Sequence, residues 1–190
     1  MIINNNTILL SSQNGSHEEY VLDPVNTGLA LPGSVVTLLY KSTEESTYVS
    51  TDSAKRLPNE ATTAQKNAAL DAIELLIIKE NALIGASINR PSQAGETILV
   101  QRAVTGDRYL VRVVAGVYEP GDPLYLTQTT NGIYFTKVLG GAPTVRAIAL
   151  EAFSVTAEIV DKVDRSTTDG VGTNEVPNGG LVNLLKVRIA

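Results

Sequence analysis

Apolar and polar side chains alternate along most of the second half of the chain, and turn-forming residues interrupt the pattern at short intervals. The ranges Thr97–Val104 and Arg108–Val114 are rich in β-forming residues. Gly106-Asp107, between them, is typical of a tight hairpin turn. We therefore expect these two ranges to be strands that are joined directly as a hairpin.

The second of these strands has the clearest alternation. Tyr109, Val111 and Val113 fall on one face of the strand. Arg108 and Arg112 fall on the other face. This pattern predicts a sheet with one buried face and one face in contact with water.

Short apolar runs between turn signals predict the remaining strands. A short edge strand is expected over Ser46–Ser50, where Tyr48 has polar neighbours. The other predicted strands are Val35–Tyr40, Leu124–Thr127, Ile133–Val138, Val145–Leu150 and Leu185–Ile189. Glu119–Pro123 is a predicted turn, and Asn131-Gly132 marks the loop of a second hairpin. Many short strands with turns between them favour a barrel or a sandwich.

One range, Asn59–Ile78, is a helix candidate. Thr62 and Gln65 have the spacing of a capping box, in which each side chain hydrogen-bonds the other's backbone amide. The run Glu74–Ile78 fits either a continuation of the helix or a buried strand, because periodicity does not separate the two over so few residues. We favour a short helix that ends near Ala72 and a strand after it.

These elements define a mainly β fold: a small β-barrel or sandwich with one short helix and an extended N-terminal arm. Residues 1–20 are expected to form the arm or a loose hairpin, because Ser11–Glu19 is polar. Residues 21–190 are expected to form a single β-barrel-like domain. It would carry a helical insertion near 60–75 and a loop insertion near 153–180, where Asp161–Gly180 is polar and glycine-bearing.

Composition narrows the classes of function. The chain has 190 residues and a net charge of −5, with no basic run, so we expect no nucleic-acid partner. It has no cysteine, which excludes disulfides and thiolate metal sites. The longest apolar run, Leu75–Ile78, is too short to cross a bilayer, so no membrane association is expected. The first residues do not have the pattern of a signal peptide, and we expect synthesis in a cytoplasm.

Residues that could support catalysis or bind a metal are few. The single histidine, His17, lies in a weakly patterned region, and no G-x-S-x-G sequence provides a nucleophile. Asp161, Asp164 and Asp169 are close in sequence but lack the spacing of a calcium-binding loop. Gly170-Val171-Gly172 lacks the context of a phosphate loop. We expect no catalytic residue, cofactor, metal site or small-molecule substrate, and therefore a protein that is not an enzyme.

A series of short motifs in the second half resembles the small β-barrel decoration, or cement, proteins of tailed-bacteriophage heads. The resemblance covers about Leu83 to Ala190 and rests on the order and spacing of the motifs. They are Leu83–Ala86, Ala94–Thr97, Gly106–Val113, Ala115–Val117, Gly121–Leu126, Asn131-Gly132, Arg146–Ala152 and Leu185–Ile189. The stretch Phe153–Gly180 is longer than the corresponding part of such proteins.

This resemblance implies a role on the exterior of the virion. Such proteins bind the outer surface of the major capsid protein, commonly as homotrimers, and stabilise the expanded head by bridging capsid subunits. The apolar stretch Ile3–Leu10 in a polar terminus is then expected to contact the capsid or a neighbouring copy. The residues assigned to this contact are Ile3, Ile8, Leu9 and Leu10.

Other classes of function compete with this one. The chain could be another virion component, such as a head-fibre base or a tail protein. It could also be a host-surface or carbohydrate-binding β module, although it has no tryptophan to form a sugar platform. A small hydrolase or peptidase is disfavoured by the poorly placed histidine.

Overall fold

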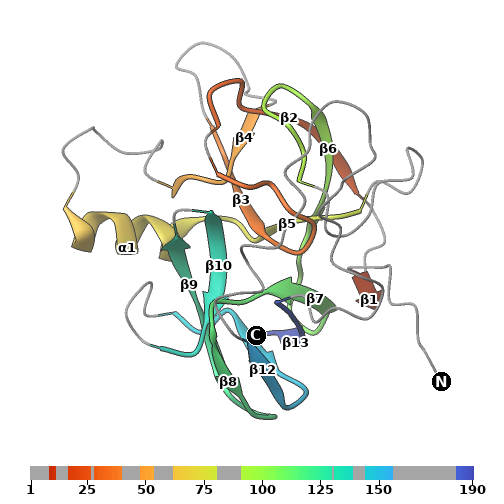
Figure 1. Cartoon of the computed structure of the whole chain (residues 1–190), viewed down its shortest axis with the longest axis vertical. Coiled ribbons are helices and arrows are strands. Elements are labelled where there is room, and N and C mark those ends of the chain that lie inside the picture. Colours follow the sequence, from red (N-terminus) through yellow and green to blue (C-terminus); the bar gives the residue numbers. More distant parts are fainter. Residues whose placement is uncertain are drawn as a thin grey trace.

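The computed structural model describes residues 9–11, 17–26, 28–39, 48–53, 62–80, 91–129, 131–138, 144–155 and 183–190. The fold is mainly β with one short helix, as predicted (Figure 1). Its first elements are β1 (Leu9–Ser11), β2 (Glu18–Leu22), β3 (Val35–Leu38), β4 (Tyr48–Ser50), α1 (Thr63–Ala72), β5 (Leu76–Ile78) and β6 (Thr97–Arg102). They are followed by β7 (Arg108–Arg112), β8 (Gly116–Tyr118), β9 (Pro123–Thr129), β10 (Gly132–Thr136), β11 (Ala147–Ala149), β12 (Phe153–Val155) and β13 (Leu184–Ile189).

Five of the early strands close into a ring, which we call the N-terminal barrel. Its strands pair in the order β3-β4-β2-β6-β5, and β5 pairs back onto β3. The pair β2–β4 is parallel and the others are antiparallel. Strand β4 therefore lies between two partners, and the prediction that Ser46–Ser50 is an edge strand is wrong. Ring closure is the reason, because it leaves no edge at that position.

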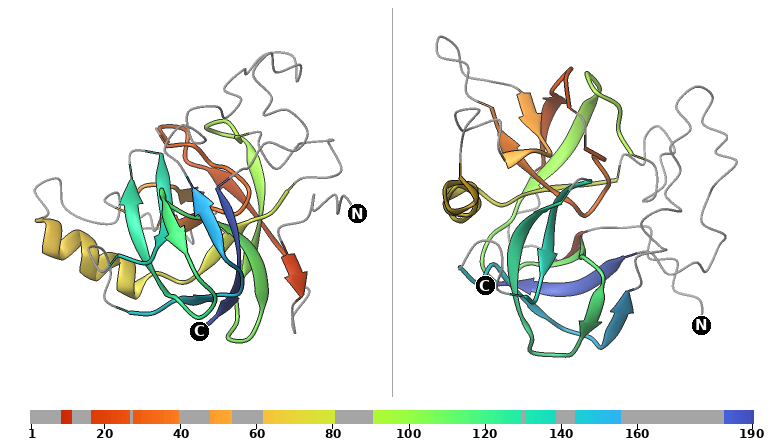
Figure 2. Two further views of the ribbon diagram at one scale, coloured as in Figure 1. Left: turned by 60° about the horizontal axis from the view of Figure 1, so that its bottom comes forward. Right: turned by 60° about the vertical axis from the view of Figure 1, so that its left-hand side comes forward.

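The later strands form a second ring, the C-terminal barrel. Its order is β7-β13-β11-β9-β10, and a parallel bridge between Val113 and Phe135 closes it. Strands β9 and β10 form the hairpin expected around Asn131-Gly132. Strand β10 also pairs with β3 through Ile133 and Val35, which joins both barrels in one sheet. The barrels lie one above the other in Figure 1, and Figure 2 shows α1 on one flank of the molecule.

Strands β3 and β5 form a wall that both barrels share. Val36 and Leu76 pack in the core of the N-terminal barrel. Val35 and Ile77, which point the opposite way, belong to the core that fills the C-terminal barrel. A strand buried on both faces reads as a continuous apolar run rather than an alternating one. This explains why the sequence around Leu75–Ile78 has no period.

The helix confirms the sequence-based expectation closely. Helix α1 begins after Thr62, whose hydroxyl accepts from the amide of Gln65, and the Gln65 side chain accepts from the Thr62 amide at 2.7 Å. It ends at Ala72, and β5 follows. Arg146 donates to the carbonyl oxygens of Asp71 and Ile73 at 3.1 and 2.9 Å, which satisfies acceptors at the C-terminal end of the helix.

Four turns of one construction introduce β3, β6, β7 and β9. They are Leu31–Ser34, Gln93–Glu96, Val104–Asp107 and Glu119–Asp122. Each has a glycine at its third position with φ between 84° and 95°, and its fourth amide donates to its first carbonyl. In the last three, a carboxylate at the fourth position accepts from the amide of the first residue. In these three turns, two hydrogen bonds therefore join the first and fourth residues before the strand begins.

The turn at Gly106-Asp107 does not make the predicted hairpin. Strand β6 pairs with β2 and β5, whereas β7 pairs with β13 and β1. The end of β13 occupies the position that β6 would need, because Ile189 bonds both Gly106 and Asp107 through the backbone. The turn instead carries the chain from one barrel to the other.

A separate two-stranded ribbon of β8 and β12 covers the C-terminal barrel. Tyr118 and Val155 point inward and are buried in its core. The first residues of the predicted insertion at 153–180 therefore form β12, and residues 156–182 lie outside the described ranges. Strand β2 likewise crosses the expected boundary at residue 20, since it starts at Glu18.

Candidate functional site

The features considered for catalysis and metal binding do not converge on a site within the described residues. His17 is exposed immediately before β2. Asp161, Asp164 and Asp169 lie outside the described ranges. Across the described part of the chain, no group of three or more histidines, cysteines, aspartates or glutamates could hold a metal ion. None of the described helices is long and apolar enough to span a membrane.

The N-terminal segment assigned to a neighbour contact supplies β1. Leu9 pairs with Tyr109 and Ser11 pairs with Arg108, and the register shifts between these two pairs. Leu10 lies between them in the strand. Of the other predicted contact residues, Ile3 and Ile8 lie outside the described ranges.

Strand β1 has a special place in the strand order. It stands at one end of the 11-stranded sheet, whereas the other end, β5, closes onto β3. Among the described strands of this sheet, β1 alone is left at an open edge. An edge strand offers backbone donors and acceptors to another chain. Strand addition is therefore the binding mode that this position makes available.

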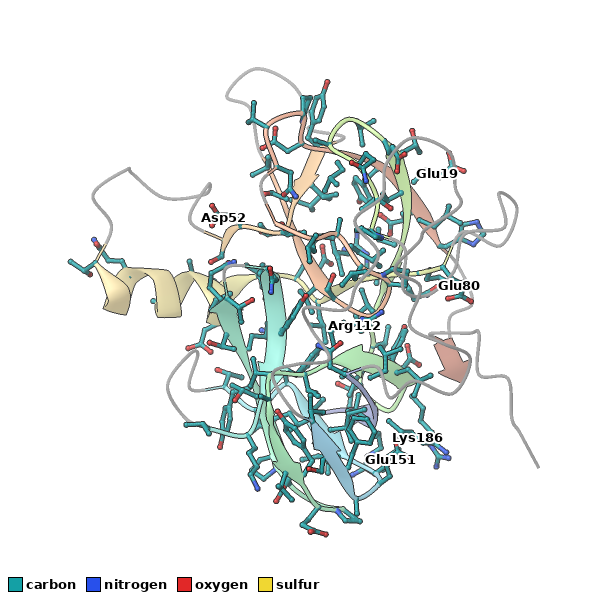
Figure 3. All side chains as sticks on the ribbon, in the orientation of Figure 1. Glu19, Asp52, Glu80, Arg112, Glu151 and Lys186 are labelled. Carbon is teal, nitrogen blue, oxygen red and sulfur yellow. The ribbon has the colours of Figure 1, made fainter. Side chains whose placement is uncertain are left out.

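The structure corrects the prediction that Arg112 faces water. Its side chain is fully buried between the two barrels (Figure 3). Its Nε donates to the Pro32 carbonyl oxygen and its Nη1 to Asn183 Oδ1, both at 2.9 Å. Burial lowers the pKa of the Arg112 guanidinium to about 10, so the group stays charged at neutral pH. The alternation of apolar and polar residues along β7 predicted an exposed side chain here, and this is wrong because the Pro32-Gly33 turn covers this part of the strand.

Arg112, Asn183, Pro32 and Gly33 together form what we call the inter-barrel clamp. The Arg112 amide donates to the Gly33 carbonyl at 2.8 Å, and Asn183 Nδ2 donates to the Val113 carbonyl at 3.0 Å. Gly33 fits so tightly that an added Cβ would lie 2.7 Å from a methyl group of β13. The clamp therefore joins β7, the start of β13 and a turn of the other barrel.

A second set of polar contacts ties the barrels together on another side. Gln128 of β9 accepts from the Ser53 amide at 2.9 Å and donates to the Thr51 carbonyl at 3.1 Å. The Leu29 amide also donates to the carbonyl of Asn131, in the β9–β10 turn, at 2.8 Å. Within the N-terminal barrel, Asn26 accepts from the Thr51 amide at 3.0 Å and so holds the segment that Gln128 contacts. With the clamp and the shared wall, these bonds hold the two barrels as one stiff body.

The outer face of the β8–β12 ribbon contrasts with its buried inner face. Val117 is 54% exposed and lies opposite the exposed Ser154. On the inner face, Tyr118 donates its hydroxyl to the Val114 carbonyl at 2.8 Å. Burial, with a smaller effect from the charge of Asp122, raises the pKa of Tyr118 to about 12. The buried Tyr118 side chain therefore holds the inner face of the ribbon against the C-terminal barrel.

Comparison of the sequence with protein-family models and with curated proteins found no match.

Sequence reasoning missed the clamp and the ribbon. Arg112 follows the strand period as an outward residue, and no local signal shows that a distant turn covers it. The ribbon strands have three residues each, too few for a recognisable pattern. The four turns did carry a signal, because a glycine followed by Ser, Glu or Asp precedes a β-rich run each time.

Proposed function

We propose that this chain is a structural virion protein that binds the outer surface of a phage capsid and stabilises the expanded head by bridging capsid subunits. The motif order from Leu83 to Ala190 supports this role through its resemblance to decoration proteins. The observation that carries it in the structure is β1, an N-terminal strand that stands at the open edge of the sheet forming both barrels, among the strands that the structure describes.

The connections between the two barrels favour a body that resists deformation, as a bridging protein needs. Two closed barrels have few free edges and share one wall, and the inter-barrel clamp fixes their relative position. A bridge between capsid subunits must transmit force without deforming. A stiff body held by buried hydrogen bonds meets this requirement better than two domains joined by a linker.

The N-terminal segment supplies the contact in this proposal. Its residues Ile3, Ile8, Leu9 and Leu10 lie on or before β1, and β1 presents one backbone edge to a partner strand. Affinity per copy can be modest, because many copies on one lattice act together. The partner is the major capsid protein, the location is the capsid exterior, and the assembled form is a homotrimer. The role requires no catalysis, cofactor, small-molecule substrate, nucleic acid or membrane.

A stability test on heads addresses the proposal. Heads are prepared without this protein and expanded, and their breakdown on heating is followed by light scattering with and without added protein. We expect the heads to break down at a higher temperature when the protein is present. An equal breakdown temperature at saturating protein would contradict the proposal.

A truncation tests the role of the arm separately. Deleting residues 1–16 removes β1 and leaves β2, which starts at Glu18. The truncated protein is expected to keep its far-UV circular dichroism spectrum and to lose binding to heads. Full binding by the truncated protein would show that another surface makes the contact.

A further inference from the structure

A row of residues crosses the outer face of the C-terminal barrel in register. Arg108 of β7 pairs with Arg188 of β13, and Arg188 pairs with Ile148 of β11. Ile148 in turn pairs with Pro123 of β9. Arg108, Arg188 and Pro123 are exposed, and Ile148 is partly exposed. We call these four residues the outer row.

The outer row lies at the uncovered end of this face. Further along β7 and β13, Leu110 and Leu184 on the same face are only 7% exposed. Beyond them Arg112 is buried under the turn of the other barrel. The N-terminal barrel therefore covers one end of the face, and the outer row forms the end that remains in contact with solvent.

The two arginines of the outer row, Arg108 and Arg188, place like charges directly opposite each other on neighbouring strands. Like charges directly opposite each other on neighbouring strands destabilise a sheet. Among the described residues, neither Arg108 nor Arg188 forms an ion pair. Lys186, two residues before Arg188, adds a third cation, and Glu151 beside it accepts a hydrogen bond from its amide at 2.9 Å (Figure 3). The two arginines therefore face each other without a carboxylate partner among the described residues.

The rest of the chain has the opposite charge. Without Arg108 and Arg188, 13 of the 15 basic residues remain against 20 acidic residues. Apart from the outer row, a second copy of this chain therefore carries seven more acidic than basic residues (20 − 13). Two guanidinium groups suit carboxylates, which they bind through paired hydrogen bonds. A nucleic acid suits the row less well, since two or three cations on an acidic protein release few counterions.

We infer that the outer row is an ionic contact between copies of this chain, in which Arg108 and Arg188 bind carboxylates of the neighbouring copy. Ile148 and Pro123 continue the row and provide apolar contact beside the ion pairs. The contact is heterologous, because a basic surface of one copy meets an acidic surface of the next. Contacts of this type build rings when the rotation between copies closes. The inference does not depend on binding to a capsid.

Charge reversal with a matched control tests the inference. Self-association of the full chain is measured by sedimentation velocity over a protein concentration series. R108E/R188E reverses the outer row, and K66E/K79E makes the same change in net charge at two cations outside it. R108Q/R188Q removes the like-charge pair without creating another. All variants are first compared with the wild type by circular dichroism and thermal unfolding.

We expect the wild type to self-associate, and the association to weaken when NaCl is raised from about 0.1 M to about 1 M, which shortens the Debye length from about 10 Å to about 3 Å. R108E/R188E and R108Q/R188Q are expected to weaken association at least about tenfold, whereas K66E/K79E changes it much less. R108Q/R188Q is also expected to unfold at the same or a higher temperature than the wild type.

Three results would overturn the inference. The first is a wild type that stays monomeric at every concentration at low salt. The second is an equal effect of the two charge reversals on association. The third is binding of a DNA duplex through the outer row without self-association, which would assign the row to phosphates instead. Binding to heads is measured separately, so failure of this contact and failure of the capsid proposal are distinguished.

Discussion

Replacement of Arg112 by alanine tests whether the inter-barrel clamp holds the fold together. The guanidinium donates two hydrogen bonds of 2.9 Å in a fully buried position. A hydrogen bond from a charged group contributes about 1.5–3 kcal/mol, and loss of a donor leaves its buried acceptor at a further cost. The guanidinium also pays for desolvation, which offsets part of this gain. We expect Arg112→Ala to lower the free energy of unfolding by about 3–5 kcal/mol.

Urea unfolding, followed by far-UV circular dichroism and tyrosine fluorescence, measures this loss. Arg108→Ala is the control, because it removes an exposed arginine from the same strand. It is expected to change the free energy of unfolding by at most about 0.5 kcal/mol. A loss below about 1 kcal/mol for Arg112→Ala would show that the inter-barrel clamp does not fix the two barrels relative to each other.

Four further substitutions test single residues. Gly33→Ala should destabilise the fold by more than about 2 kcal/mol, because φ is +88° and a Cβ would lie 3.0 Å from the Leu110 carbonyl oxygen and 2.7 Å from a buried leucine methyl. Gly121→Ala, with φ of +95° and open space around it, should cost about 1 kcal/mol. Glu18→Gln should lower stability by about 0.5 kcal/mol at neutral pH. Hydrogen bonds from Arg102 and then from a tyrosine lower the pKa of Glu18 from 4.5, so this difference should vanish as the pH falls below that value. In a spectrophotometric titration, one tyrosine should ionise near pH 12, and Tyr118→Phe should remove that step.

Each of these has a contradicting result. Equal costs for the two glycine substitutions in urea unfolding would show that contacts at Gly33 do not matter. A wild-type advantage over Glu18→Gln that grows on acidification would reverse the expected sign for a carboxyl group with a lowered pKa. A titration in which Tyr118→Phe leaves the high-pH step unchanged would assign that step to another tyrosine.

Local patterns predicted the elements well because each depends on neighbours in sequence. The capping box at Thr62 and Gln65 and the end of the helix near Ala72 were both correct. The strand predicted over Leu185–Ile189 is β13, which begins one residue earlier. The hairpin of β9 and β10 follows from a local turn.

Pairing between distant segments was not predictable in the same way. The turn before β7 was recognised, yet its strands pair elsewhere because β13 takes the position beside it. Arg112 fits an outward position until a turn some 80 residues away covers it. For the candidate site, the sequence indicated the apolar segment that supplies β1. It did not indicate that β1 stands at the open edge or that two arginines face each other across β7 and β13.

The most direct test of the capsid role is co-sedimentation of the purified protein with expanded, DNA-free heads prepared without it. We expect saturable binding at a fixed number of copies per head. Absence of binding over the whole concentration range, with heads equally stable with and without the protein, would contradict it.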